Sequence, residues 1–170
     1  MRKFILSLFA IVMVASFSNK VMAQSNADSD ALATLIVPLS IANDVAMDFK
    51  TVAASATAGT VVMTAAATAV VTAHDGATVV SGTPTAGKFT VTGDGTQAFT
   101  ITLPATASTL TGSVSGDITV DTWTCSEADL NNAALASGTL VFYVGGTLNI
   151  DADEVAGLYS GTFNVIVDYN

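Results

Sequence analysis

Three carboxylates lie close together near the C-terminus, where they could bind a cation. Asp151, Asp153 and Glu154 fall within four residues and precede Gly157, and calcium takes several oxygen ligands from a loop. The spacing does not match an EF-hand loop, and acidic side chains at a turn between strands are usually hydrated. These residues are therefore weak candidates for a calcium site, and we expect no resident metal.

The single histidine does not indicate catalysis. His74 begins the sequence His74-Asp75-Gly76, which is typical of a turn. The chain has no Gly-x-Ser-x-Gly elbow, no His-Glu-x-x-His and no glycine loop suited to phosphate. No arginine follows residue 2, so an anionic substrate would find no bidentate partner. We expect no enzyme activity and no cofactor.

Cys125 is the only cysteine, so the chain cannot form a disulfide within itself. The simplest interpretation is a small, buried apolar residue. An intermolecular disulfide or a reactive thiol is the alternative. If Cys125 is a buried apolar residue, the stability of the fold comes from packing alone.

Residues 1–23 have the pattern of a signal peptide. Two basic residues precede an apolar run, Phe4–Phe17, and Ala23 provides a small residue at the expected cleavage position. The run is shorter than the roughly 20 residues that span a bilayer. We therefore expect a protein that begins at Gln24, is secreted through the periplasm to the extracellular space or the cell surface, and has no membrane span after cleavage.

The chain that follows the signal peptide is strongly acidic. Lys50 and Lys88 are its only strong bases, and against all 14 acidic residues they give a net charge of −12. Such a surface repels phosphate backbones and anionic lipids. We therefore expect no binding to nucleic acid or to a membrane surface.

Short alternating runs of Thr, Val, Ile and Phe, separated by Gly, Asp, Asn and Ser, predict an all-β chain. The runs Lys88–Val91 and Ala98–Leu103 flank Gly93-Asp94-Gly95 and predict a hairpin. Its inward side chains would be Phe89, Val91, Phe99, Ile101 and Leu103.

Two further segments complete the predicted architecture. The run Gly138–Ile150 contains Gly145-Gly146, which indicates a bulge or bend. Ser126–Leu135 is the best candidate for a short helix or a long loop. About ten short strands with almost no helix favour an immunoglobulin-like Greek-key β-sandwich.

The two ends of this chain differ from its middle. Residues 24–43 form a polar leader and then an alternating strand, Ala31–Ile41, and residues 44–170 form the sandwich domain. The large side chains on one face of the first strand are Leu35, Val37, Leu39 and Ile41. Pro38 cannot donate to a ladder, so this is an edge strand or an inserted one. The last strand, Leu158–Tyr169, has an apolar face made of Tyr159, Phe163, Val165, Val167 and Tyr169.

Several segments in order resemble a family of secreted bacterial proteins, domain of unknown function 4402. They are Ala33–Ile41, Met47–Phe49, Lys88–Gly93, Phe99–Pro104, Leu140–Leu148 and Ala156–Tyr169. The C-terminus is also similar to pilins of chaperone–usher systems, including the archaic, spore-coat-U-like kind. Their pattern is a penultimate aromatic residue, here Tyr169, and a glycine fourteenth from the end, here Gly157. Many such pilins contain a disulfide, which this chain cannot form.

The second resemblance implies a structural subunit of a filament or pilus. Its N-terminal strand would insert beside the last strand of the next subunit, which gives a homo-polymer assembled with a periplasmic chaperone and an outer-membrane usher. The same side-chain pattern suits a strand that pairs within its own chain. A self-contained cell-surface or extracellular-matrix module therefore stays open, as does a soluble periplasmic domain that binds carbohydrate or an ion.

Overall fold

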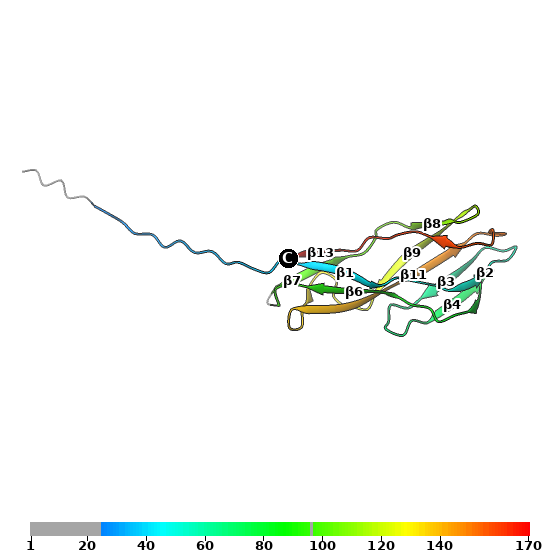
Figure 1. Ribbon diagram of the computed structural model, residues 1–170, viewed down its shortest axis with the longest axis horizontal. Coiled ribbons are helices and arrows are strands. Elements are labelled where there is room, and N and C mark those ends of the chain that lie inside the picture. Colours follow the sequence, from blue (N-terminus) through cyan, green and yellow to red (C-terminus); the bar gives the residue numbers. More distant parts are fainter. Residues whose placement is uncertain (1–24, 96) are drawn as a thin grey trace, which may run out of the picture. The chain divides into compact units, whose positions relative to one another are not determined.

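The computed structural model describes residues 25–95 and 97–170, and the predicted signal peptide lies outside them. The chain divides into two units, Met1–Thr34 and Leu35–Asn170. Residues 25–34 belong to no strand and are exposed. The second unit contains 13 strands and no helix, so the prediction of an all-β chain is confirmed for the described residues (Figure 1). Among these residues no helix is long and apolar enough to cross a membrane.

Every strand pair is antiparallel, and the strands form three sheets. The large sheet has the order β1 (Ser40–Val45), β6 (Gly87–Thr92), β11 (Thr139–Ile150), β9 (Asp117–Cys125), β8 (Ser108–Gly112) and β12 (Tyr159–Ser160). In the same sheet β3 (Gly59–Met63) pairs with β11 and with β4 (Val71–Asp75). The second sheet has the order β10 (Ala133–Ala134), β7 (Ala98–Thr102) and β13 (Ile166–Tyr169), and the third pairs β2 (Thr51–Ala53) with β5 (Thr78–Ser81).

The long strand β11 organises the large sheet, because it exchanges one partner along its length. Its first half pairs with β6 and its second half with β3, while β9 runs along the other side. The exchange falls at Gly145 and Gly146, and a side chain at Gly145 would meet the backbone at the end of β3. The register against β9 also shifts between Gly145 and Thr147. The predicted bulge is therefore confirmed.

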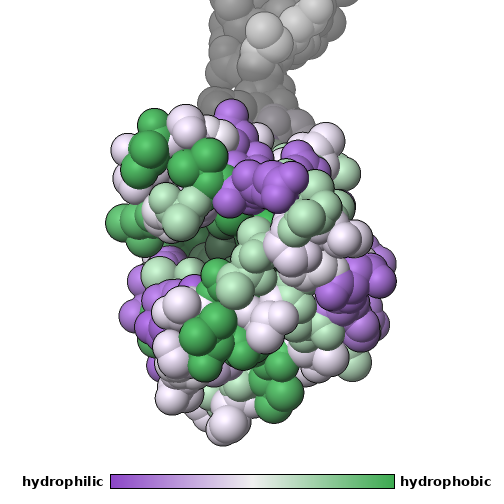
Figure 2. Space-filling model, turned by 90° about the vertical axis from the view of Figure 1, so that its right-hand side faces the viewer, coloured by the Kyte–Doolittle hydropathy of each residue, from purple (hydrophilic) through white to green (hydrophobic). Residues whose placement is uncertain are grey.

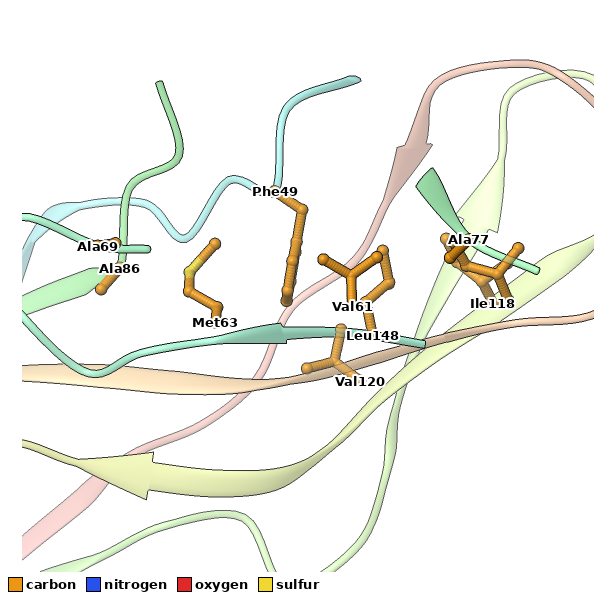
Figure 3. Close-up of a cluster of buried hydrophobic side chains, with 10 residues drawn as sticks. Phe49, Val61, Met63, Ala69, Ala77, Ala86, Ile118, Val120 and Leu148 are labelled. Atoms are coloured by element: carbon orange, nitrogen blue, oxygen red, sulfur yellow. The ribbon is translucent and has the colours of Figure 1, made fainter. Parts of the chain in front are cut away.

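Two hydrophobic clusters form the core. One lies between β6 and β11 of the large sheet and β7 and β10 of the second sheet, and Phe89 and Phe142 stack in it with ring centroids 5.5 Å apart. The other lies over β3, β9 and the second half of β11 (Figure 3). Its largest side chains include Phe49, Met63 and Leu148. Neither cluster contains a buried polar or charged side chain, since none is buried among the described residues.

The predicted hairpin is wrong. Strand β6 pairs with β1 and β11, whereas β7 pairs with β10 and β13 in the other sheet. The chain therefore passes from one sheet to the opposite one between Thr92 and Ala98. The inward faces were predicted correctly, since Phe89, Val91, Phe99 and Ile101 are buried and Leu103 is half-buried against the same cluster. Alternation shows only that one face of each strand is buried against a core. Two strands in opposite sheets meet that condition as well as the two strands of a hairpin do.

Ser126–Leu135 forms no helix, so of the two predicted alternatives the long loop is the correct one, and the two-residue strand β10 lies within it. The carboxylate of Asp129 accepts a hydrogen bond from the backbone N–H of Asn131, at 3.1 Å, which closes a local turn. The carbonyl of Leu130 then accepts from the N–H of Ile101 at 2.7 Å. The N–H of Ser126 donates to the carbonyl of Tyr143 in β11 at 2.9 Å, and a single turn bond runs from the N–H of Asn132 to the carbonyl of Asp129 at 3.4 Å. The segment is thus bonded mainly to its neighbouring strands.

Candidate functional site

A groove with a volume of about 780 Å³ lies at one end of the domain. One wall is residues 46–54, which follow β1, and the other is residues 154–161, which contain β12. The floor is apolar and consists of Leu110, Ile118, Leu148 and Ile150. Figure 2 faces this end of the domain and shows a hollow with hydrophobic residues around it. We call this cavity the groove.

The groove narrows in the direction of β13. A smaller cavity of about 60 Å³ continues it and shares Met47, Phe49, Leu110 and Gly161 with it. The rings of Trp123 and Phe163 lie there, with centroids 4.6 Å apart. Still further along, β1 and β13 come into contact. We call the two adjoining cavities the wedge: its wide end is the large cavity lined by Ile150, and its narrow end is the small cavity lined by Phe163.

The wedge opens where two sheet edges diverge. Strand β1 is an edge of the large sheet, and β13 is an edge of the second sheet. Residues 161–165, between β12 and β13, belong to no strand. The predicted strand Leu158–Tyr169 is thus interrupted, because Gly161 follows the two residues that pair with β8 and the chain then crosses to the other sheet.

The alternation of side chains continues through this interruption. Val165 is buried, and Tyr159, Phe163, Val167 and Tyr169 are half-buried, whereas Asn164 and Asp168 are exposed. Gly157 is exposed on the groove wall. The predicted apolar face is therefore the inner face, but only Tyr159 and Phe163 reach the two cavities.

The groove also carries polar contacts, among them an ion pair in which Lys50 Nζ lies 2.6 Å from Asp48 Oδ2. The Tyr159 hydroxyl lies 2.8 Å from Glu154 Oε1 and 2.5 Å from the carbonyl oxygen of Val155. Desolvation and the adjacent Glu154 carboxylate raise the pKa of Tyr159. Asp151 and Asp153 are exposed nearby. In the part of the chain that the structure describes, no group of three or more His, Cys, Asp or Glu side chains could hold a metal ion.

The N-terminal segment is placed differently along its length. Strand β1 starts at Ser40, so residues 31–39 belong to no strand. Leu35 is 90 % exposed and Val37 is 58 % exposed. By contrast, Ile41 pairs with Val91, and both Leu39 and Ile41 pack against their own core. The strand predicted over Ala31–Ile41 therefore forms only at its last two residues, because only those reach the edge of β6.

Trp123 is the lining residue that strict alternation misplaces. With Ile118 and Val120 facing inward, the pattern would place Trp123 outside. The structure has a bulge in β9, where Asp121 to Thr124 lie opposite only Gly145 to Thr147. Thr122 adopts a φ of 48°, which is uncommon for a β-branched residue, and this turns Trp123 inward. The sequence signal for this bulge was the pair of glycines, Gly145 and Gly146, in the partner strand β11.

Neither remaining candidate belongs to this site. His74 lies exposed on β4. Cys125 is half-buried and free, and burial raises the pKa of its thiol. We expect reductant to leave the melting temperature unchanged, and Cys125→Ala to lower stability by about 1 kcal/mol, as for loss of one small group. Thermal unfolding followed by circular dichroism measures both, and a large shift with reductant would indicate an intermolecular disulfide.

Comparison with known protein families gives a match over most of the chain. The family model described as "Domain of unknown function (DUF4402)" matches residues 39–169. No curated protein and no solved structure matches the chain. The matched range starts beside β1 and ends within β13, so it covers both walls and the floor of the groove.

Proposed function

Since this chain belongs to the family of domain of unknown function 4402, whose description assigns no activity, we propose a function from its geometry. The protein is a structural subunit of an extracellular filament or pilus. The N-terminal arm, defined here as residues 25–38, inserts as a strand into the groove of the next subunit. The observation that carries this proposal is an exposed, alternating apolar arm in the same chain as an open apolar groove.

The arm has the composition that the groove requires. Leu35 and Val37 are exposed in the single chain, and each would contribute about 1.5–3 kcal/mol on burial, or roughly 3–6 kcal/mol together. Hydrogen bonds with the segments that border the wedge would add to this, as in other cases of strand addition. In this proposal the domain is an immunoglobulin-like Greek-key sandwich whose missing strand comes from the neighbour.

The taper of the groove favours one direction of insertion. The arm carries small residues, Ala31 and Ala33, before the larger Leu35 and Val37. The larger pair fits the wide end beside Ile150, and the alanines fit the narrow end beside Phe163. With this direction of insertion, Val37 is the inserted residue nearest the open end of the wedge. The domain to which the arm belongs then lies just outside that end. The contact is head-to-tail, and a head-to-tail contact that does not close into a ring gives a filament.

An open apolar groove and two sheet edges expose a subunit to aggregation before it assembles. The proposal therefore includes a periplasmic chaperone that covers the groove and an outer-membrane usher. Secretion to the cell surface follows from the same proposal.

Cysteine pairs test both the insertion and its direction, in a Cys125→Ala background. Val37→Cys with Val155→Cys places both thiols at the wide end, and we expect a ladder of covalent oligomers on non-reducing gels. Val37→Cys with Ser108→Cys is the matched pair for the narrow end and should give no ladder. A ladder only from the second pair would reverse the direction. No ladder from either pair, together with a monomer that melts reversibly, would overturn the proposal in favour of a self-contained surface module.

A further inference from the structure

The penultimate residue connects three separate parts of the domain. The Tyr169 hydroxyl donates a hydrogen bond to the carbonyl oxygen of Val37, at 2.8 Å. It also accepts one from the backbone N–H of Asp94, at 2.6 Å, in the segment between β6 and β7. Tyr169 itself lies in β13, opposite Phe99 of β7. The base of the arm is thus bound to the C-terminal strand across 132 residues of sequence.

An apolar contact accompanies this hydrogen bond. Leu39 packs against the cluster that contains Leu135. A side chain at Gly93 would collide with the Tyr169 hydroxyl and would lie 2.9 Å from Leu39 Cδ1. Gly93 therefore leaves room for both side chains. Val37 is held by a polar contact and Leu39 by an apolar one, and Pro38 between them restricts the backbone φ.

Val37 accepts the hydrogen bond from Tyr169 through its backbone, while its side chain is 58 % exposed. Leu35 is 90 % exposed, and Ile36 is 44 % exposed. Residues 25–36 span about 40 Å if fully extended at roughly 3.3 Å per residue. Release of residues 37–39 would add about 10 Å of slack by the same measure.

We propose that Tyr169 is a positioning residue that fixes the point and direction at which the arm leaves its own domain. This inference rests on the proposed function, because the arm matters only if it reaches a neighbour. In a filament the anchor sets the distance between consecutive domains and limits their bending. The hydroxyl group, rather than the aromatic ring, performs this role.

Tyr169→Phe tests the anchor because it keeps the ring and removes the hydroxyl. In the full secreted chain we expect the ¹⁵N order parameters of Val37 and Leu39 to fall from near 0.85 to below about 0.6, the range of flexible backbone. Those of β13 should not change. Gly93→Ala should have the same effect on the arm, since it displaces the hydroxyl. Tyr143→Phe is the matched control, since it removes a hydroxyl from β11, outside both cavities, and should leave Val37 and Leu39 unchanged.

A second measurement connects the anchor to assembly. Filaments of Tyr169→Phe subunits should form, with a persistence length in electron micrographs at least two-fold shorter than that of the wild type. Unchanged order parameters in Tyr169→Phe would overturn the anchor. Loosened arms with filaments of unchanged stiffness would overturn its role in spacing subunits. Absence of filaments in the wild type would instead contradict the proposed function, and the order parameters would still decide the anchor.

Discussion

The double variant Leu35→Asp and Val37→Asp is expected to form no filaments while its domain folds normally. Both side chains are exposed in the single chain, so the charges cost little there. In the groove each carboxylate would face Leu148, Ile150 and neighbouring apolar groups. Burial of an unpaired charge costs several kcal/mol even after relaxation. That cost exceeds the gain of about 3–6 kcal/mol that the two native side chains would bring.

The matched control places the same two charges on the opposite face of the arm. Leu32→Asp and Thr34→Asp alternate with the groove-facing residues, so both carboxylates would point to solvent. Filaments of this variant should persist, with assembly slowed at low salt because the subunit is already strongly acidic. Electron microscopy and sedimentation measure both variants. Equal loss in both would mean that charge, and not the apolar face, controls assembly.

A peptide of residues 31–38 extends the test to stability. A chain that lacks residues 25–36 keeps β1 intact, because that strand starts at Ser40, but it has no arm to donate. The peptide should raise the melting temperature of this truncated chain by filling the groove. A peptide with Leu35 and Val37 changed to Asp should have no effect. If the two peptides act alike, the groove does not recognise the apolar face.

The sequence predicted which side chains face inward better than which strands pair. Alternation identifies a face, and Phe89, Val91, Phe99 and Ile101 are buried as that pattern requires. It does not identify a partner, so β6 and β7 look like a hairpin although they lie in different sheets. Only the pairing of the two strands in three dimensions separates these two cases.

The sequence predicted some of the residues that line the wedge, but not the break in the last strand on which the wedge depends. Tyr159 and Phe163 were on the predicted apolar face, and both contribute to the wedge. The wedge itself depends on the break at residues 161–165, and alternation continues through that break without a sign of it. Trp123 reaches the cavity only because Thr122 adopts a positive φ. Such a local backbone choice depends on the opposite strand and not on the residue itself.

Val165→Asp is expected to prevent folding altogether. Val165 is 8 % exposed and lies in the cluster with Phe142 and Val144. An aspartate there would be buried without a partner, since Lys50 and Lys88 already pair with Asp48 and Asp44. The cost of several kcal/mol is comparable with the 5–15 kcal/mol that holds a typical domain together. Because residues 161–165 belong to no strand, no ladder of backbone bonds would hold them in place once the side chain is expelled.

Asn164→Asp is the control for this variant, because it adds the same charge one residue away on an exposed position. Its melting temperature should stay within a few degrees of the wild type, as for most surface substitutions. Soluble yield and circular dichroism distinguish the two outcomes directly. If Val165→Asp folded and Asn164→Asp did not, the chain would face the core in a register shifted by one residue. Phe163 and Val167, which share the face of Val165, would then point to solvent, and the narrow end of the groove would lose the ring that closes it.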